Sequence, residues 1–195
     1  MKYTLSLLIA GVMAAGTVSA QKVNFGVKAG ANISTIKYDP DLDNGTKVGF
    51  HAGGLAHIHL APQLALQPEV LYSMQGAKNN MLNGKTEFTL GYIAVPVMLQ
   101  YMFDNGFRIE AGPQVSFLTS AKKEIANVET DIKKEINKAD FGVGAGISYV
   151  MKSGFGIDAR YNFGLNDISK DKIANPYKAY NRGAQIGLFY QFSHK

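Results

Sequence analysis

Residues 107–117 read FRIEAGPQVSF, a stretch in which hydrophobic and polar side chains alternate. Phe107, Ile109 and Phe117 belong to one set, whereas Arg108 and Glu110 belong to the other. Successive side chains of a β-strand point to opposite faces, so this alternation predicts a strand with one apolar and one polar face. The class of fold then depends on which of the two faces points into the molecule.

The same alternation recurs along most of the chain. The segments that carry it are 23–33, 48–60, 64–74, 86–102, 107–117, 141–151, 155–165 and 184–192. Short turns with the sequences APQ, FDNG and KSG alternate with long polar connections, and such turns suit β-hairpins. The long connections are 35–47, 75–85, 120–138 and 166–181. The pattern predicts an all-β fold, an eight-stranded antiparallel up-and-down barrel with both termini at the short-turn end.

The third long connection leaves a local question open. Ile125, Val128, Ile132 and Ile136 are spaced almost as on one face of a helix. The connection therefore contains either a short amphipathic helix or an extension of the neighbouring strands, and the sequence alone does not decide between them.

The first 20 residues have the pattern of a secretory signal peptide. Lys2 is the basic start, residues 5–12 form a short apolar core, and Val18-Ser19-Ala20 precedes the expected cleavage after Ala20. The alternative is a membrane anchor, but the apolar run is far shorter than the roughly 20 residues of a spanning helix. Residues 21–195 are then the mature barrel domain.

The composition limits what the mature chain binds and what holds it together. Cysteine is absent, so disulfides cannot stabilise the exported domain. The net charge of +5 is mild, and acidic and basic residues are mixed along the chain. The balance does not predict a nucleic-acid-binding protein.

Two closed barrels fit eight alternating strands. A soluble, lipocalin-like barrel turns its apolar face inward around a small apolar ligand, whereas a membrane barrel turns that face to lipid. Glycines such as Gly30, Gly53, Gly112 and Gly144 share the polar face. An eight-stranded barrel has little interior space, so small residues on this face favour a polar interior and hence the membrane barrel.

The polar face also carries long side chains of both signs. We expect these to form an interior charge network, because buried charges need partners. The predicted network consists of Lys28, Glu69, Arg108, Glu110, Asp158 and Arg160. Arg108 and Glu110 then point into the barrel, with Glu69, Asp158 and Arg160 as their candidate partners. In the soluble alternative the same residues are solvated surface charges.

Aromatic residues on the apolar face gather near the strand ends. Two aromatic girdles that bound an aliphatic band are typical of a membrane barrel. The girdle at the long-loop end consists of Phe50, Tyr72, Phe117, Phe141 and Phe163. The girdle at the short-turn end consists of Phe25, Tyr101, Phe107, Tyr149, Phe155, Tyr190 and Phe192.

Several stretches resemble the PorT-like outer-membrane β-barrel family of Gram-negative bacteria. The stretches are LQPEVLYSMQG, YIAVPVMLQY, EAGPQVSFL, DFGVGAGISY, DARYNFGL and IGLFYQF. The resemblance implies a barrel in the outer membrane with long loops outside and short turns in the periplasm. Most members have no assigned function, and a minority belong to a secretion and gliding apparatus. This chain departs from the family pattern at Ala94 and Gln100, where an acid and a lysine are common.

Residues that could carry chemistry are few. His51, His57 and His59 share the polar parity of one strand, and we expect them to be hydrogen-bonded interior histidines. A metal shared by His57 and His59 would need a third ligand. Ser73 and Ser116 share the interior with His51, but no nucleophile motif surrounds them. We therefore expect no catalytic, metal-binding or cofactor-binding residues, no cofactor and no enzymatic activity.

The expected function is that of an integral outer-membrane protein with a charge-plugged interior and long extracellular loops. Its role would lie in envelope structure, adhesion or partner binding, with a secretion apparatus as one setting. The expected partners are outer-membrane lipid, lipopolysaccharide, the barrel-assembly machinery during insertion, and a specific protein that the sequence does not identify. A monomer that binds no nucleic acid is expected. The alternative is the soluble periplasmic carrier described above.

Overall fold

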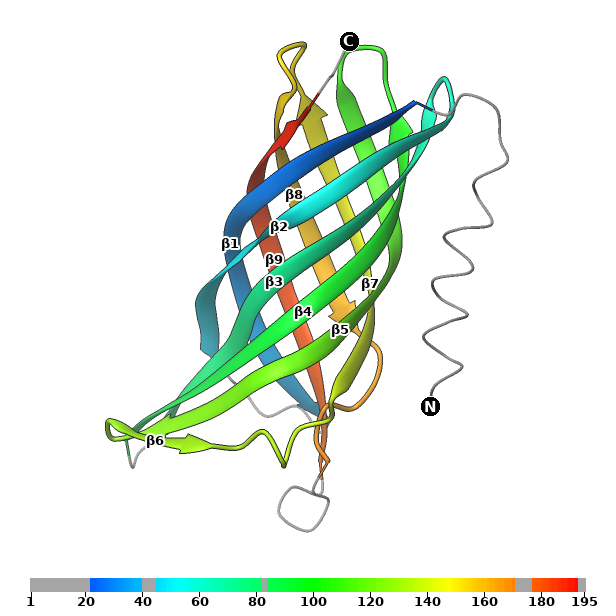
Figure 1. The fold of residues 1–195 in the computed structure, drawn as a ribbon. Helices are drawn as coiled ribbons and strands as arrows, with labels where there is room; N and C mark the ends of the chain where they lie inside the picture. The colour runs from blue at the N-terminus through cyan, green and yellow to red at the C-terminus, as the bar shows by residue number, and fades with distance from the viewer. Residues whose placement is uncertain (1–21, 40–44, 82–83, 171–176, 193–195) are drawn as a thin grey trace.

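Eight long strands form a closed antiparallel barrel in the computed structural model of the chain (Figure 1). The structure describes residues 22–39, 45–81, 84–170 and 177–192. The signal-peptide interpretation of residues 1–20 lies outside them. The strands are β1 Val23–Asp39, β2 Gly45–Ala61, β3 Leu64–Met81, β4 Gly84–Met102, β5 Phe107–Ile125, β6 Val128–Asp131, β7 Ala139–Val150, β8 Phe155–Gly164 and β9 Lys178–Gln191.

Backbone pairing runs around the whole ring. Each strand pairs with its neighbours in the chain, β4 with β5 and β5 with β7 included. The first and last strands close the ring from Gly26↔Gln191 to Asp39↔Lys178. Among the described strands, β6 alone lies outside the ring, and it pairs with β5. The predicted eight-stranded up-and-down barrel is confirmed. No helix among the described residues is long and apolar enough to span a membrane.

The short turns have the conformations that their glycines permit. Gly106 and Gly154 both have φ of 90°, in the left-handed region that glycine tolerates best. The Gly106 amide donates to the Phe103 carbonyl, and the Gly154 amide donates to the Met151 carbonyl in the same way. FDNG and KSG therefore form equivalent hairpin turns at one end of the barrel.

The predicted long loops are wrong over much of their length, because the strands continue into them. β1 continues to Asp39, β3 to Met81 and β5 to Ile125, and their partners begin correspondingly early. β5 then turns through Ala126 and Asn127, both with positive φ, into the short strand β6. The third long connection thus contains a strand extension instead of a helix.

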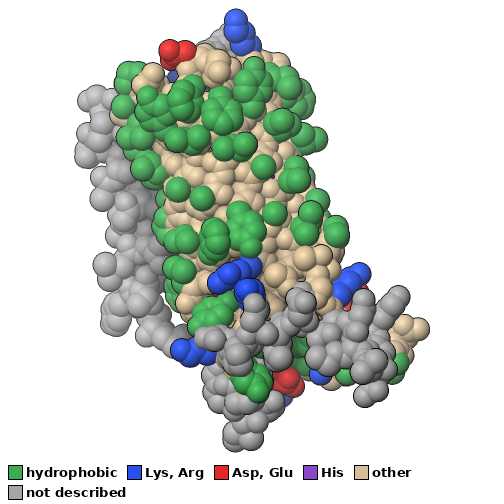
Figure 2. Space-filling view, turned by 180° about the vertical axis from the view of Figure 1, so that it is seen from behind, with side chains coloured by type: hydrophobic (Ala, Val, Ile, Leu, Met, Phe, Trp, Pro, Cys, Tyr) green, Lys and Arg blue, Asp and Glu red, His purple; other side chains and the backbone are tan. Residues whose placement is uncertain are grey.

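The apolar face of the barrel points outward. Figure 2 shows hydrophobic side chains over the wall, with charged side chains gathered toward its ends. Phe25 is 64% exposed and Ile186 is 60% exposed, which a soluble barrel of this size would not tolerate over its whole wall. Aromatic residues of both predicted girdles lie on this face, where Phe50 packs on Tyr72 and Phe155 packs on Tyr190. The lipocalin-like alternative is not favoured.

The polarity of the two faces reverses beyond the girdle at the long-loop end. On β1 the inward residues change from Ser34 to Ile36, and on β9 from Asn181 to Ala179. On β5 the inward residue changes from Ser116 to Leu118, while the outward residue changes from Phe117 to Thr119. We call this end of the barrel, together with β6, the extension. Its segments are 35–39, 45–47, 75–81, 84–92, 118–138, 165–170 and 177–181.

The extension has an apolar core of its own. A cluster of buried side chains fills its interior: Ile36, Ala77, Leu90, Tyr92, Leu118, Ala121, Ile132, Ile168 and Ala179. Where water replaces lipid outside the wall, apolar side chains gain by turning inward. The reversal therefore marks the level at which the barrel leaves its apolar surroundings.

An ion pair on the extension should make its stability depend on pH. The buried Lys47 ammonium lies 2.7 Å from Glu87 Oε1 and also contacts the Thr89 hydroxyl. The hydrogen bond from Lys47 holds the pKa of Glu87 below its usual range. Glu87 then stabilises the fold above its unfolded pKa, and this contribution is lost as the pH falls through the folded pKa. Amide exchange in β3 and β4 should therefore speed up in acid, and Glu87→Gln should remove that dependence. An unchanged acid dependence in the variant would contradict this assignment.

Candidate functional site

The six charged residues predicted for the interior lie inside the barrel. They come from β1, β3, β5 and β8, and each is at most 5% exposed. The set is Lys28, Glu69, Arg108, Glu110, Asp158 and Arg160, three cations and three anions, which sum to zero. Glycines lie beside them on neighbouring strands: Gly146 on β7 pairs with Arg160, and a Cβ on Gly146 would lie 3.0 Å from the Arg160 Cα.

Arg160 is the centre of this network. Its Nη2 lies 2.8 Å from Glu69 Oε1, and its Nη1 donates to Glu69 Oε2 at 3.1 Å. Its Nε donates to Glu110 Oε1 at 2.9 Å. Lys28 pairs with Asp158 at 2.7 Å and lies 3.8 Å from Glu69. Charge-assisted contacts of this kind connect strands that are not neighbours in the sheet.

Arg108 does not have the partners that the sequence suggested. Its guanidinium donates to the amide oxygens of Gln100 at 3.5 Å and Gln191 at 3.3 Å. Gln100 in turn donates to Glu110 Oε2 at 2.6 Å. Gln100 therefore connects Arg108 to the carboxylates indirectly, and the expected direct pairing of Arg108 with an acid is wrong. Glu110, by contrast, bonds directly to Arg160.

The three histidines are separated by depth. His51 and His57 are buried in the lumen, whereas His59 is only partly buried at the short-turn rim, near the Lys22 carbonyl. The rings of His57 and His59 meet edge to face with centroids 4.7 Å apart. Among the described residues, no three His, Asp or Glu side chains are grouped as a metal site requires. The expectation that His59 lies in the interior is therefore wrong, because this residue lies at the rim.

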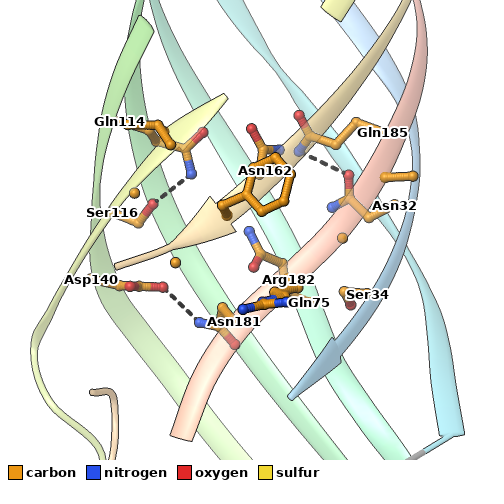
Figure 3. A pocket seen from close by; sticks show the side chains of 16 residues that line it. Asn32, Ser34, Gln75, Gln114, Ser116, Asp140, Asn162, Asn181, Arg182 and Gln185 are labelled. Carbon is orange, nitrogen blue, oxygen red and sulfur yellow. Dashed lines mark hydrogen bonds between the residues drawn. The ribbon is translucent and has the colours of Figure 1, made fainter. Parts of the chain in front are cut away.

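Amide and hydroxyl side chains fill the lumen between the charges and the extension. Asn32 is their hub: its Nδ2 donates to Ser73 Oγ at 3.0 Å, and its Oδ1 contacts His51 Nδ1 at 2.8 Å. Gln185 donates to the same Asn32 oxygen at 3.1 Å (Figure 3). The hydroxyl of Ser73 and the Nδ1 atom of His51 are thus both hydrogen-bonded to Asn32.

A small polar chamber lies beside this hub. Its volume is about 20 Å³, enough for about one water molecule. Figure 3 shows side chains from several strands converging on it, among them Gln114, which donates to Ser116 Oγ. Asp140 accepts a hydrogen bond from Asn181 at 2.7 Å, and Asn181 also contacts the Tyr92 hydroxyl. Tyr92 therefore presents its hydroxyl to the polar chamber and its ring to the apolar cluster.

The sequence did not predict that Tyr92, Asp140 and Asn181 form a layer between the polar lumen and the apolar cluster. Tyr92 lies within the predicted strand 86–102, Asp140 directly precedes the predicted strand 141–151, and Asn181 lies at the end of a predicted loop. The spacing of the residues could have indicated one of them. Asn181 and Gln185 are an even number of positions apart, so they lie on the same face of a strand, and both face inward.

Comparisons with known proteins agree with the barrel fold. A family model described as an outer membrane protein beta-barrel domain matches residues 19–170. The crystal structure of Neisserial surface protein A (NspA) superposes with a TM-score of 0.61 at 17% identity, covering 88% of this chain and 99% of that one. Ail, the attachment invasion locus protein of Yersinia pestis, superposes with a TM-score of 0.52 at 14% identity, with coverage of 88% and 99%. At these identities the likeness concerns the fold alone. The comparison with curated protein sequences gives no match.

Proposed function

Because the chain belongs to the family of outer membrane protein β-barrel domains, we propose that it is a non-enzymatic outer-membrane protein whose extension binds a partner outside the cell. The observation that carries this proposal is the neutral, fully buried charge network. Side chains fill the lumen at that level, so a wide solute channel is disfavoured. The extension is then the part of the barrel wall that meets water and is free to bind.

The geometry around the serines supports the non-enzymatic part of the proposal. Ser73 accepts hydrogen bonds from Asn32 and Gln75, and Ser116 accepts one from Gln114. A nucleophilic serine needs a base that takes its proton. His51 is hydrogen-bonded to Asn32 through Nδ1, and among the described residues no hydrogen bond joins it to Ser73 or Ser116.

The edge of the extension is a surface suited to a protein partner. β6 pairs on one side only, and all four of its residues are exposed. Val128 is 65% exposed and Ile125 is 43% exposed. Figure 1 shows β3, β4, β5 and β6 projecting together beyond the rest of the ring. An exposed edge strand can accept a strand from another chain.

The remaining parts of the proposal concern setting and partners. The chain would be exported through its signal peptide, inserted by the barrel-assembly machinery and retained as a monomer in outer-membrane lipid. Lipopolysaccharide phosphates would meet the lysines of the extension, such as Lys122 and Lys133. The PorT-like resemblance adds a secretion apparatus as one setting, beside adhesion and envelope structure.

Shortening the β5–β6 hairpin tests the proposal. Lys123 and Thr130 are paired, so replacing residues 124–129 by Asn-Gly should close a tight turn without disturbing the barrel. We expect unchanged heat-modifiable gel mobility but loss of proteins that cross-link to the extension on intact cells. Val128→Asp, which keeps the hairpin, should weaken the same cross-links. Equal cross-linking by the unmodified chain, the shortened chain and Val128→Asp would contradict a role for this edge.

A further inference from the structure

The interior of the extension contains a cavity of about 260 Å³. Its walls are formed by β1, β4, β5 and β9 and by the segments that connect β6 to β7 and β8 to β9. Two aromatic rings, those of Tyr38 and Phe88, line it together with six aliphatic side chains: Ile36, Leu90, Ile132, Ile136, Ile168 and Ala179. Five of these six belong to the buried cluster, and Ile136 packs against it.

Irregular segments complete the barrel wall around this cavity. The Leu118 amide donates to the Lys138 carbonyl at 2.9 Å, and the Ile132 amide donates to the Ala121 carbonyl at 3.0 Å. The Ile168 amide donates to the Ala179 carbonyl at 2.8 Å. These segments meet each other through the bridge between Ile136 and Ser169. In Figure 1 the segment after β6 runs across this end of the barrel.

The size and lining of the cavity indicate an apolar occupant. A cavity of about 150 Å³ lined by Leu, Ile and Phe stays dry and binds benzene, so a larger cavity of this lining accommodates a longer aliphatic or aromatic group. The cavity lies beyond the aromatic girdle and inside the ring of strands. Acyl tails of the surrounding lipid lie on the other side of the wall. The occupant therefore enters from water.

A cation at the cavity indicates the polar end of that occupant. Lys123 lines the cavity, and its ammonium lies 5.6 Å from the centre of the Phe88 ring. Glu135 also lines the cavity, but it is exposed to water, whereas Lys123 is partly buried. We propose that the extension binds a small amphiphile whose aliphatic chain fills the cavity and whose anionic head lies at Lys123. This site is independent of the protein partner proposed for β6.

The absence of tryptophan from the chain provides a clean reporter. Phe88→Trp places a single indole at the cavity, and tryptophan keeps the contact with Lys123. The full barrel carrying this substitution would be placed in lipid vesicles, which contain no other tryptophan, and titrated with octanoate, octan-1-ol and octylamine. We expect a saturable change in emission with octanoate and, at higher concentration, with octan-1-ol. Octylamine should give no saturable change.

Two further variants in the Phe88→Trp background distinguish binding in the cavity from partition of the ligand into the lipid bilayer. Lys123→Gln should weaken octanoate binding by roughly threefold to fivefold, as expected for a partly exposed charge contact, and leave octan-1-ol unchanged. Ala179→Leu should fill the cavity and abolish the response to both. Equal affinities for octanoate and octylamine, or a Lys123→Gln variant that binds octanoate normally, would contradict the proposal that the ligand has an anionic head at Lys123. A response that is linear, or that survives Ala179→Leu in a folded barrel, would overturn the site.

Discussion

Replacing Arg160 by alanine is expected to lower the free energy of unfolding by about 3–5 kcal/mol, the range for breaking a buried ion pair. The guanidinium bonds both Glu69 and Glu110, and all three side chains are nearly inaccessible to solvent. Its removal leaves two carboxylates in a narrow lumen, where their remaining partners among the described residues are Gln67, Gln100 and Lys28, the last 3.8 Å from Glu69. Unfolding in urea from lipid vesicles would measure the loss.

Two variants make the measurement specific. Adding Glu110→Gln to Arg160→Ala should recover part of the loss, because one unpaired charge is then absent. Arg182→Ala is the matched control, since Arg182 is only partly buried on β9. A loss in Arg160→Ala that is no larger than in Arg182→Ala would contradict the central position of Arg160.

Replacing Ile186 by arginine is expected to cost about 2–4 kcal/mol, as for a cation near the middle of a bilayer. Ile186 is 60% exposed and pairs with Ala31 on one side and Ala159 on the other, between the two aromatic girdles. Folding titrations in lipid vesicles would measure the cost.

The matched control for this substitution is Val128→Arg. Val128 is as exposed as Ile186 but lies on β6, where it meets water. Its replacement should change the free energy by no more than about 0.5 kcal/mol, the range for an ordinary surface substitution. Equal costs at both positions would mean that the wall around Ile186 does not face lipid.

The sequence was sufficient to predict the barrel because one rule, the alternation of apolar outward and polar inward side chains, holds along its wall. Strict alternation around residues such as Ile109 and Arg108 identifies strands, and glycine on the polar face indicates a crowded interior. The same rule failed in the extension. There Ile36, Leu118 and Ala179 face inward and polar residues face outward, so a search for apolar side chains on the lipid face ended these strands too early.

The details of the interior depend on geometry that spacing does not contain. Glu110 and Arg160 lie on strands that are not neighbours in the sheet, and parity alone could name them only as candidates. Arg108 was misassigned because its partners are the amides of Gln100 and Gln191, which carry no charge signal. His59 shares the parity of His57 but lies at the rim, because strand parity gives the face of a residue and not its depth.

Labelling of single cysteines in intact cells tests most directly the claim that the chain is an outer-membrane barrel with its extension outside. The chain has no cysteine of its own, so each introduced thiol reports one position. With a membrane-impermeant maleimide, Val128→Cys should react in intact cells. Asn105→Cys, in the turn after β4, should react only after the outer membrane is opened, and Ile186→Cys should stay unreacted in both. Reaction of Asn105→Cys but not Val128→Cys in intact cells would reverse the orientation, and reaction of Ile186→Cys would contradict the membrane barrel itself.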